Sequence, residues 1–388
     1  MRSHRCSTVA LYGSAGALFV TGADAGLYWG DGPLSLPWVG VLHATDPDRG
    51  PLGDTLFVNR SQPSTMSTRP ATTPNYQRLP DEEFQARVEE LWARYADCDL
   101  CAYDCRVDRT AGETGACRVD DTAYVASYFD HHGEEAVLRG HNGSGTIFLA
   151  HCNMTCVFCQ NFETSHEAKG EPATPEEIAD MALELQAKGC HNVNFVSPTH
   201  HSPHLVDAVR IARDRGLEVP VVWNCGGYER TEILELLDGV VDIYMPDVKW
   251  SDDAAAAEYS KAPGYWSNIK DSLREMHRQV GDLDIDAKGL ATGGLLVRHL
   301  VMPEHVDNAK DVLSFLADEI SQATFVNVMA QYRPHYKAAS EERYAAINRR
   351  ITAEEYQSVL DHARAVGLER IEYDPAMAAD GDHTSPWR

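Results

Sequence analysis

The chain lacks any uninterrupted apolar run of the roughly 18 residues that a membrane-spanning helix needs. Basic residues are scarce, because 34 Lys and Arg stand against 59 Asp and Glu, and the formal net charge is −25. The long-range field of such a charge opposes binding to nucleic acid and to anionic membranes. We therefore expect a soluble protein with neither partner, and 388 residues suffice for one large domain or two.

Cysteines are too few for a scaffold built on disulfides, since the whole chain has ten. Seven of them fall in two tight clusters, which is typical of metal ligation in a reducing compartment. We therefore expect a cytoplasmic location. Cys6, Cys190 and Cys225 are isolated, and burial as small apolar side chains is the default for such thiols.

The denser cluster consists of Cys152, Cys156 and Cys159, directly after the apolar run 145–150. Three thiolates can hold three irons of a cubane [4Fe–4S] cluster, whereas ferredoxin-type clusters take four cysteines. One iron then remains open for chemistry. A structural zinc needs a closed tetrahedral set of ligands, and the local sequence supplies no fourth one. The spacing therefore predicts an iron–sulfur cluster with an open iron.

The second cluster has the spacing C-x2-C-x3-C-x11-C and consists of Cys98, Cys101, Cys105 and Cys117. Four thiols are enough for a complete tetrahedral metal site. Zinc and an auxiliary iron–sulfur cluster share a preference for thiolates, so the spacing leaves both open. The alternative is that these cysteines bind no metal and are only packed.

Composition divides the chain into three parts. Residues 1–79 are interrupted every few positions by Pro, Gly or Asp and include a Ser/Thr/Pro-rich linker, which indicates a poorly structured extension with Met66 as a candidate for the true start. A faint resemblance to a secretory signal is the weaker interpretation. Residues 80–140 are expected to form a helix and the cysteine-rich metal-binding segment. Residues 141–388 are expected to form the core, with a C-terminal helix.

Within the core, apolar runs alternate with helical patterns, as in repeated βα units. The expected strands are 146–150, 192–197, 219–224, 240–245, 295–301 and 324–329, and the expected helices are 175–188, 202–215, 268–280, 307–320 and 352–366. Several helices begin with Ser, Thr or Asp, and glycines follow at 189, 216, 281 and 367, where C-terminal caps belong. The pattern by itself predicts a parallel α/β protein.

The first cysteine motif and four further strings together resemble the radical S-adenosylmethionine (SAM) superfamily. Within it they are similar to the PflX-like group, which is related to the pyruvate formate-lyase activating enzymes. The strings are SPTH at 197–200, YMPDVK at 244–249, RHLVMP at 298–303 and QYRP at 331–334. The resemblance runs from about Cys98 to about Gly367. It implies an α/β fold, an open partial (β/α)6 barrel similar to a TIM barrel, with the cysteine-rich segment N-terminal to it.

The resemblance also implies a chemistry. SAM would chelate the open iron, and one electron would cleave it to methionine and a 5′-deoxyadenosyl radical that abstracts a hydrogen atom from a substrate. That substrate is either a glycine of a partner protein, as for glycyl-radical activases, or a small molecule or peptide, and the reductant would be a ferredoxin or flavodoxin. The alternative from another class is a non-enzymatic iron–sulfur or zinc protein that transfers electrons or binds a partner.

Reactive groups in α/β barrels gather where the strands end, and each motif lies at such an end. By resemblance, the cluster ligands are the three cysteines of the first motif, the cofactor-binding residues are Ser197, Thr199, Asn224, Gly226, Asp247 and Arg298, and the catalytic residues are Asp247, Lys249 and Arg298. Activating enzymes usually have a Gly-Gly-Glu-like loop where this chain has 197–200. The alternative role of Asp247 and Lys249, and likewise of Arg298, is a structural ion pair. His200 and His201 are expected to be solvated, and their alternative role is to bind substrate or metal.

Overall fold

A computed structural model describes residues 9–13, 16–20, 45–46, 50–51 and 73–374. The chain divides into two compact units, Met1–Ser64 and Thr65–Arg388. In the first unit, Val9–Gly13 (β1) pairs antiparallel with Gly16–Val20 (β2), and Thr45–Asp46 (β3) pairs with Gly50–Pro51 (β4). Most of the extension expected over residues 1–79 otherwise lies outside the described residues.

A ten-stranded sheet organises the second unit. Its parallel strands, in spatial order, are Ser144–Leu149 (β6), Val193–Val196 (β8), Val221–Cys225 (β9), Ile243–Pro246 (β10), Ala291–Leu300 (β12), Phe325–Met329 (β13) and Arg370–Tyr373 (β14). The short strand Asp284–Ile285 (β11) pairs with β12. The six expected strands are confirmed to within a few residues, and β14 adds a seventh parallel strand. The central strands are buried, which explains their apolar sequences.

An antiparallel extension covers the free edge of β6. Ala123–His131 (β5) pairs with β6, and Glu171–Ala173 (β7) pairs with β5. The sequence pattern predicts no strand here, because much of β5 is half-buried or exposed and its apolar residues do not form a continuous run. The strand matters for the site, since it ends at His131 and leads into Glu134.

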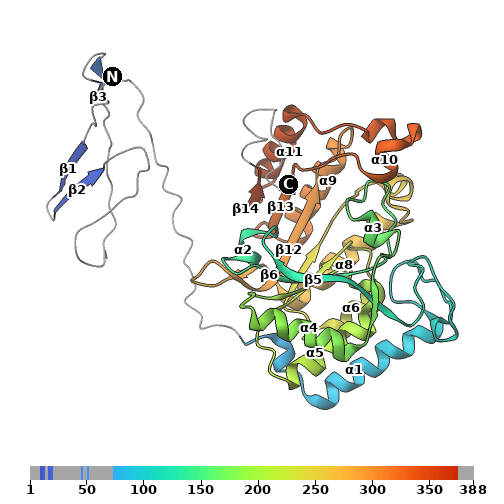
Figure 1. Ribbon diagram of the computed structural model, residues 1–388. Coiled ribbons are helices and arrows are strands. Elements are labelled where there is room, and N and C mark those ends of the chain that lie inside the picture. Colours follow the sequence, from blue (N-terminus) through green and yellow to red (C-terminus); the bar gives the residue numbers. More distant parts are fainter. Residues whose placement is uncertain (1–8, 14–15, 21–44, 47–49, 52–72, 375–388) are drawn as a thin grey trace, which may run out of the picture. The chain divides into compact units, whose positions relative to one another are not determined.

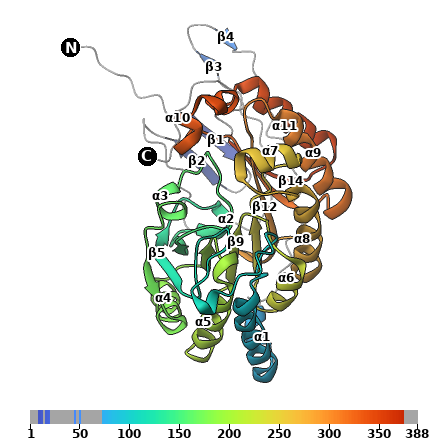
Figure 2. The same ribbon diagram turned by 90° about the vertical axis from the view of Figure 1, so that its right-hand side faces the viewer.

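Helices form a layer around the outside of the strands (Figures 1 and 2). The longer ones are Asp81–Ala93 (α1), Pro175–Ala187 (α4), Ser202–Asp214 (α5), Thr231–Leu237 (α6), Tyr265–Val280 (α8), Val306–Phe315 (α9) and Ala353–Ala365 (α11). Short helices are Ala136–Arg139 (α2), Phe162–Ser165 (α3), Asp253–Ala255 (α7) and Tyr336–Ser340 (α10). Turns of 3-10 helix lie at Asn75–Gln77, Arg94–Asp97, Arg109–Ala111, Thr199–His201 and Glu342–Ile347, and π-helical turns at Ala256–Ser260 and Leu316–Ile320. No helix in the described ranges is long and apolar enough to span a membrane.

Local sequence signals define several helix ends. Thr174 and Thr352 each begin a helix with a capping box, in which the side chain of the third helical residue, Glu177 or Glu355, bonds back to the threonine N–H. The four glycines that follow helices at 189, 216, 281 and 367 all have positive φ. These are the cap positions that the sequence predicts, so the helix boundaries follow from short-range chemistry.

The residues immediately before α1 pack on the barrel. Tyr76 is fully buried, and its hydroxyl donates to the Val219 carbonyl at 2.8 Å. The Asn75 N–H donates to Asp242 Oδ1 at 2.6 Å. Helix α1 buries Phe84, Val88 and Leu91 and packs against α5 and α6. The second unit thus has its own core from residue 76 onward.

A shortened chain that begins at Met66 should therefore fold and bind iron as the full chain does. The division between units falls at residue 64, and among the described residues the hydrophobic core of the second unit begins at Tyr76. Thermal unfolding followed by circular dichroism, and iron content after anaerobic reconstitution, measure the effect. A melting temperature lower by more than about 5 °C, or loss of iron, would show that the preceding residues belong to the fold.

Candidate active site

The loop after β6 carries Cys152, Cys156 and Cys159 into one cavity of about 300 Å³ at the carboxyl ends of the strands. All three are free thiols. In the described part of the chain, no three His, Cys, Asp or Glu side chains converge on the position of a single metal ion. The thiolates of a cubane bind separate irons, so a cysteine set spread around a cavity fits such a cluster better than one ion.

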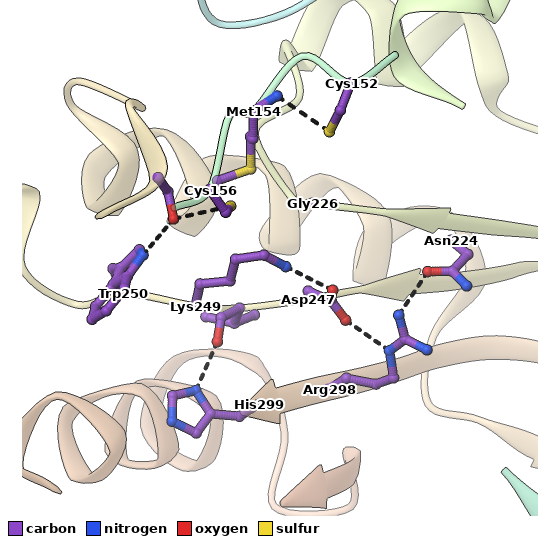
Figure 3. Close-up of polar contacts among 12 residues, drawn as sticks. Cys152, Met154, Cys156, Asn224, Gly226, Asp247, Lys249, Trp250, Arg298 and His299 are labelled. Atoms are coloured by element: carbon purple, nitrogen blue, oxygen red, sulfur yellow. Dashed lines mark hydrogen bonds and ion pairs between the residues drawn. The ribbon is translucent and has the colours of Figure 1, made fainter. Parts of the chain in front are cut away.

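A polar group contacts the sulfur of each of the three cysteines, and Figure 3 shows the contacts of Cys152 and Cys156. The Met154 N–H donates to Cys152 Sγ at 3.3 Å, and the Cys156 thiol donates to Ser260 Oγ at 3.2 Å. Cys159 Sγ lies 3.1 Å from Ser165 Oγ. Contacts of this kind orient ligands and tune the potential of an iron–sulfur cluster. Ser260 belongs to a π-helical turn far along the chain, and no sequence signal pointed to it.

Burial controls the charge of these thiols. It raises the pKa of Cys152 to about 12 and that of Cys156 to about 11, while the nearby Lys249 ammonium acts in the opposite direction at both. Without metal the two thiols are therefore neutral. Iron binding has to release their protons, as is general for thiolate ligands.

Close packing fixes the position of the cysteine loop. A Cβ atom at Gly226 would lie only 2.6 Å from Met154 Sδ, so glycine here lets the Met154 side chain pack against the end of β9 without shifting. The Asn153 amide donates to the Tyr228 carbonyl at 3.1 Å, and the Val157 N–H donates to the Tyr259 carbonyl at 2.8 Å. The sequence motif thus becomes a rigid arc over the strand ends.

A half-buried ion network forms part of the wall of the same cavity (Figure 3). Asp247 follows β10, and its two oxygens accept from Lys249 Nζ at 2.6 Å and from Arg298 Nε at 2.7 Å. Burial acts against ionisation of Asp247, but the charges of Arg298 and Lys249 outweigh it and lower the pKa to about 2. The three residues are therefore charged at neutral pH and hold one another in place.

Two further residues complete the surroundings of Arg298. Its Nη2 donates to Asn224 Oδ1 at 2.8 Å, and its Nη1 lies 3.4 Å from Glu134 Oε2. Burial tends to raise the pKa of Glu134, but His131 and Arg298 lower it overall. Glu134 comes from the turn after β5 and was missed at the sequence level, since an acidic residue in a polar turn carries no periodic signal.

In the loop after β8, one side chain lines the cavity and the others are buried in the interior. Ser197 lines the cavity and has a positive φ of 58°, whereas Thr199 does not line it, because its hydroxyl donates to the buried Glu229 at 2.5 Å. His200 and His201 are buried, not solvated as the sequence suggested, and each has its Nε2 within 3.3 Å of the Ala150 carbonyl. They support the strand end that precedes Cys152.

Cys98, Cys101, Cys105 and Cys117 surround a single small cavity of about 10 Å³. Gly115 allows this arrangement, because a Cβ there would lie 2.7 Å from Cys105 Sγ. The Ala116 N–H donates to the same sulfur at 3.4 Å. The four cysteines, spread over twenty residues of sequence, thus line the same cavity, although no three of them are placed to hold a single ion.

Arg109 lies in the wall of this small cavity and is fully buried. Its guanidinium donates to the Asp120 and His200 carbonyls at 2.7 and 2.9 Å, stacks 4.1 Å from the Tyr95 ring centre, and lies 4.0 Å from Cys98 Sγ. Its Nη2 has no hydrogen-bond partner, and no carboxylate among the described residues pairs with it. The positive charge of Arg109 therefore lies beside the second cysteine set without a carboxylate partner among the described residues.

The isolated cysteines that the structure describes are packed in the interior, and so is Phe158, the aromatic residue before the last cysteine of the first motif. Cys190 and Cys225 are buried as expected, although Cys225 also lines the larger cavity, and Cys6 lies outside the described residues. Phe158 lines the cavity and meets Trp250 and Tyr332 edge-on at 6.0 and 6.1 Å. It closes one side of the cavity with apolar surface.

The chain is similar to a family profile and to an archaeal protein. The family profile described as the Radical SAM superfamily matches residues 146–316. An uncharacterized protein of Methanocaldococcus jannaschii is 35% identical over 298 residues, which cover 74% of this chain and 80% of that protein.

Solved structures with a related arrangement share little sequence. SuiB of Streptococcus suis, bound to precursor peptide SuiA, has a TM-score of 0.41 and 10% identity over 58% of this chain and 46% of SuiB. The chain thus spans about half the length of SuiB. A domain of pyruvate-formate lyase-activating enzyme from Bacteroides vulgatus has a TM-score of 0.29 and 14% identity, over 52% of this chain and 91% of that domain.

Proposed function

The chain belongs to the radical SAM superfamily, and we propose that Cys152, Cys156 and Cys159 hold the [4Fe–4S] cluster with which this SAM-dependent enzyme works. The observation that carries the proposal is the convergence of the three free cysteines on one cavity, beside the half-buried Asp247 network. When bound, the cluster supplies the electron that cleaves SAM and so provides a radical for abstracting a hydrogen atom. The residues of the chain bind and orient SAM and the substrate, and they exclude water from the cavity.

Lys249 and Arg298 are proposed to provide fixed positive charge at the cavity wall. Both are held by Asp247, so neither has to be reorganised when a ligand arrives. Lys249 counteracts the pKa rise at all three cysteines, which places its charge where it stabilises an anionic thiolate–iron centre. Arg298 also donates a hydrogen bond to the side-chain oxygen of Asn224. The N–H groups of the Asn224 amide can then donate to a ligand.

Ser197, Asn224 and Gly226 are proposed to contact SAM, because all three line the cavity at neighbouring strand ends. The absence of a side chain at Gly226 exposes backbone to a ligand. Thr199 is proposed to act indirectly, since its bond to Glu229 fixes the shape of the loop that presents Ser197.

Anaerobic reconstitution with iron and sulfide, followed by reduction in the presence of SAM, tests the function directly. The expected products are methionine and 5′-deoxyadenosine, quantified against protein without reductant. A reconstituted protein that binds iron but yields neither product would instead favour an electron carrier or a partner-binding protein.

The glycyl-radical activase version of this function requires a partner protein whose glycine reaches the cavity, with a ferredoxin or flavodoxin as reductant. The position of Asp247 and Lys249 on the cavity supports it, because this Asp-x-Lys string is the element that resembles the activating enzymes. Electron paramagnetic resonance of a mixture with a glycyl-radical protein, SAM and reductant would detect the radical on the partner.

The second cysteine set is proposed to bind a metal centre of its own. A buried guanidinium without a carboxylate is costly, and Arg109 has only carbonyls, a ring and thiols around it. Four thiolates around zinc, or around the core of a [4Fe–4S] cluster, leave net negative charge at the site that Arg109 faces. The charge of Arg109 thus supports a metal centre over four neutral thiols.

Cys101→Ala should remove that centre and lower the melting temperature by about 5 °C or more, because metal binding there is coupled to folding of its segment. Elemental analysis should show loss of one site, as zinc or as iron with sulfide, while the iron bound at Cys152, Cys156 and Cys159 remains. Cys190→Ala is the matched control, since Cys190 is a buried thiol outside both sets. Unchanged metal content and melting temperature in Cys101→Ala would mean that the four cysteines are only packed.

A further inference from the structure

A second cavity, of about 520 Å³, adjoins the one that holds the cysteines. The two share six lining residues, namely Gln160, Asn161, Val196, Asn224, Arg298 and Gln331. None of the three cluster cysteines lines the second cavity. A molecule in it would lie beside the cluster site and not on it, which is the position required of the compound that loses hydrogen. Its volume is within the range of about 300–1,000 Å³ usual for ligand pockets.

The residues that line this second cavity carry a net positive charge, which is unusual for so acidic a protein. Glu134 is the only carboxylate among its described lining residues, and it faces Arg298, which Asp247 also neutralises. Arg333 is the remaining charged residue, and two histidines, His131 and His335, line the cavity as well. A positive cavity in a chain of net charge −25 selects anionic ligands by its local field.

Arg333 is the group to which a ligand would bind, because its guanidinium lacks a partner in the described part of the chain. Its Nη2 is buried without a hydrogen bond, and no described residue forms an ion pair with Arg333. A buried donor of this kind is stable only when a ligand or water satisfies it. The planar guanidinium fork matches a carboxylate or phosphate, to which it donates two parallel hydrogen bonds.

The backbone around Arg333 is held rigidly. Tyr332, the preceding residue, is buried and donates its hydroxyl to the Ile347 carbonyl at 2.7 Å. Pro334, the following residue, restricts the conformation of Arg333 itself. Elsewhere in the wall, Phe148 supplies an aromatic surface and stacks on Phe129 with ring centres 5.5 Å apart. The cavity thus offers one cation on a held backbone and one apolar face.

We infer that the second cavity binds the substrate through an oxyanion, a carboxylate or a phosphate, held by Arg333. The inference rests on the proposed function, whose substrate class it specifies. It favours an acidic small molecule or a peptide with an acidic group over an uncharged glycine loop of a partner protein.

Isothermal titration calorimetry of the reconstituted protein, without reductant, tests the inference with two probes at constant ionic strength. Succinate represents the carboxylate and inorganic phosphate the phosphate, and each is titrated with and without saturating SAM. We expect one-to-one binding of one probe, retained in the presence of SAM, and the probe that binds identifies the oxyanion. Arg333→Gln should weaken that binding at least tenfold, and Arg333→Lys should restore part of it.

Arg343→Gln is the matched control, because Arg343 is exposed and paired with Glu341 on the surface. It should leave probe affinity unchanged, and melting curves verify that each variant is folded. Failure of both probes to bind, or equal affinity in wild type and Arg333→Gln, overturns the inference. Binding that SAM abolishes also overturns it, since Arg333 would then serve SAM itself. Because calorimetry needs no turnover, absence of SAM cleavage would count against the proposed function and not against the oxyanion site.

Discussion

Cys156→Ala is expected to abolish reductive SAM cleavage while the barrel stays folded. Cys156 is one of only three cysteines on the cavity loop, so its loss leaves two ligands for a cluster that needs three. Its side chain is small, and the loop is also held by bonds from neighbouring residues, including Val157 N–H to the Tyr259 carbonyl. We expect the yield of 5′-deoxyadenosine to fall at least a hundredfold, with little change in the circular dichroism spectrum.

Cys190→Ala controls for the loss of any buried thiol, because Cys190 is equally buried but distant in sequence from both cysteine sets. It should retain iron and SAM cleavage. Iron and sulfide analysis of Cys156→Ala separates loss of the cluster from loss of a later step. Undiminished cleavage in this variant would contradict the assignment of the cluster to the loop after β6.

Asp247→Ala should damage both stability and activity. It leaves Arg298 and Lys249 without their shared carboxylate, and because the network is half-buried the loss of stability should be smaller than the roughly 3–5 kcal/mol that breaking a fully buried pair costs. Both cations would also lose their fixed positions at the cavity wall. We expect a clearly lower melting temperature and a decrease of at least about a hundredfold in SAM cleavage, roughly 2.7 kcal/mol in barrier height.

Two further variants separate charge from position. Asp247→Asn keeps the shape and an acceptor oxygen but removes the charge, so it should cleave SAM almost as poorly as Asp247→Ala while losing less stability. Asp271→Ala removes an exposed carboxylate that pairs with Arg274 and should change stability by less than about 0.5 kcal/mol. If Asp247→Ala melts and cleaves SAM as the wild type does, the network has no role in holding the site.

Much of the fold follows from short stretches of sequence. The six apolar runs became parallel strands because both faces of the sheet are covered, and Thr174 with Glu177 shows how a four-residue signal defines where a helix begins. Strand β5 was missed, since its pairing with β6 and its partial exposure depend on the sheet edge that it covers. Strand β14 was missed for a related reason, as three half-buried residues and one exposed residue form a strand only beside β13.

The sequence by itself determined the chemistry of the cysteines and the strand ends to which the motif residues belong. Cysteine spacing decides how many ligands a loop can offer, and parallel strands bring their carboxyl ends to one edge. Only the tertiary structure decided the burial of His200 and His201, the turn of Thr199 toward Glu229, and the contacts of Arg298 with Glu134. It also left Arg109 and Arg333 without carboxylate partners. Such pairings join residues far apart in the chain, so no local pattern of residue types contains them.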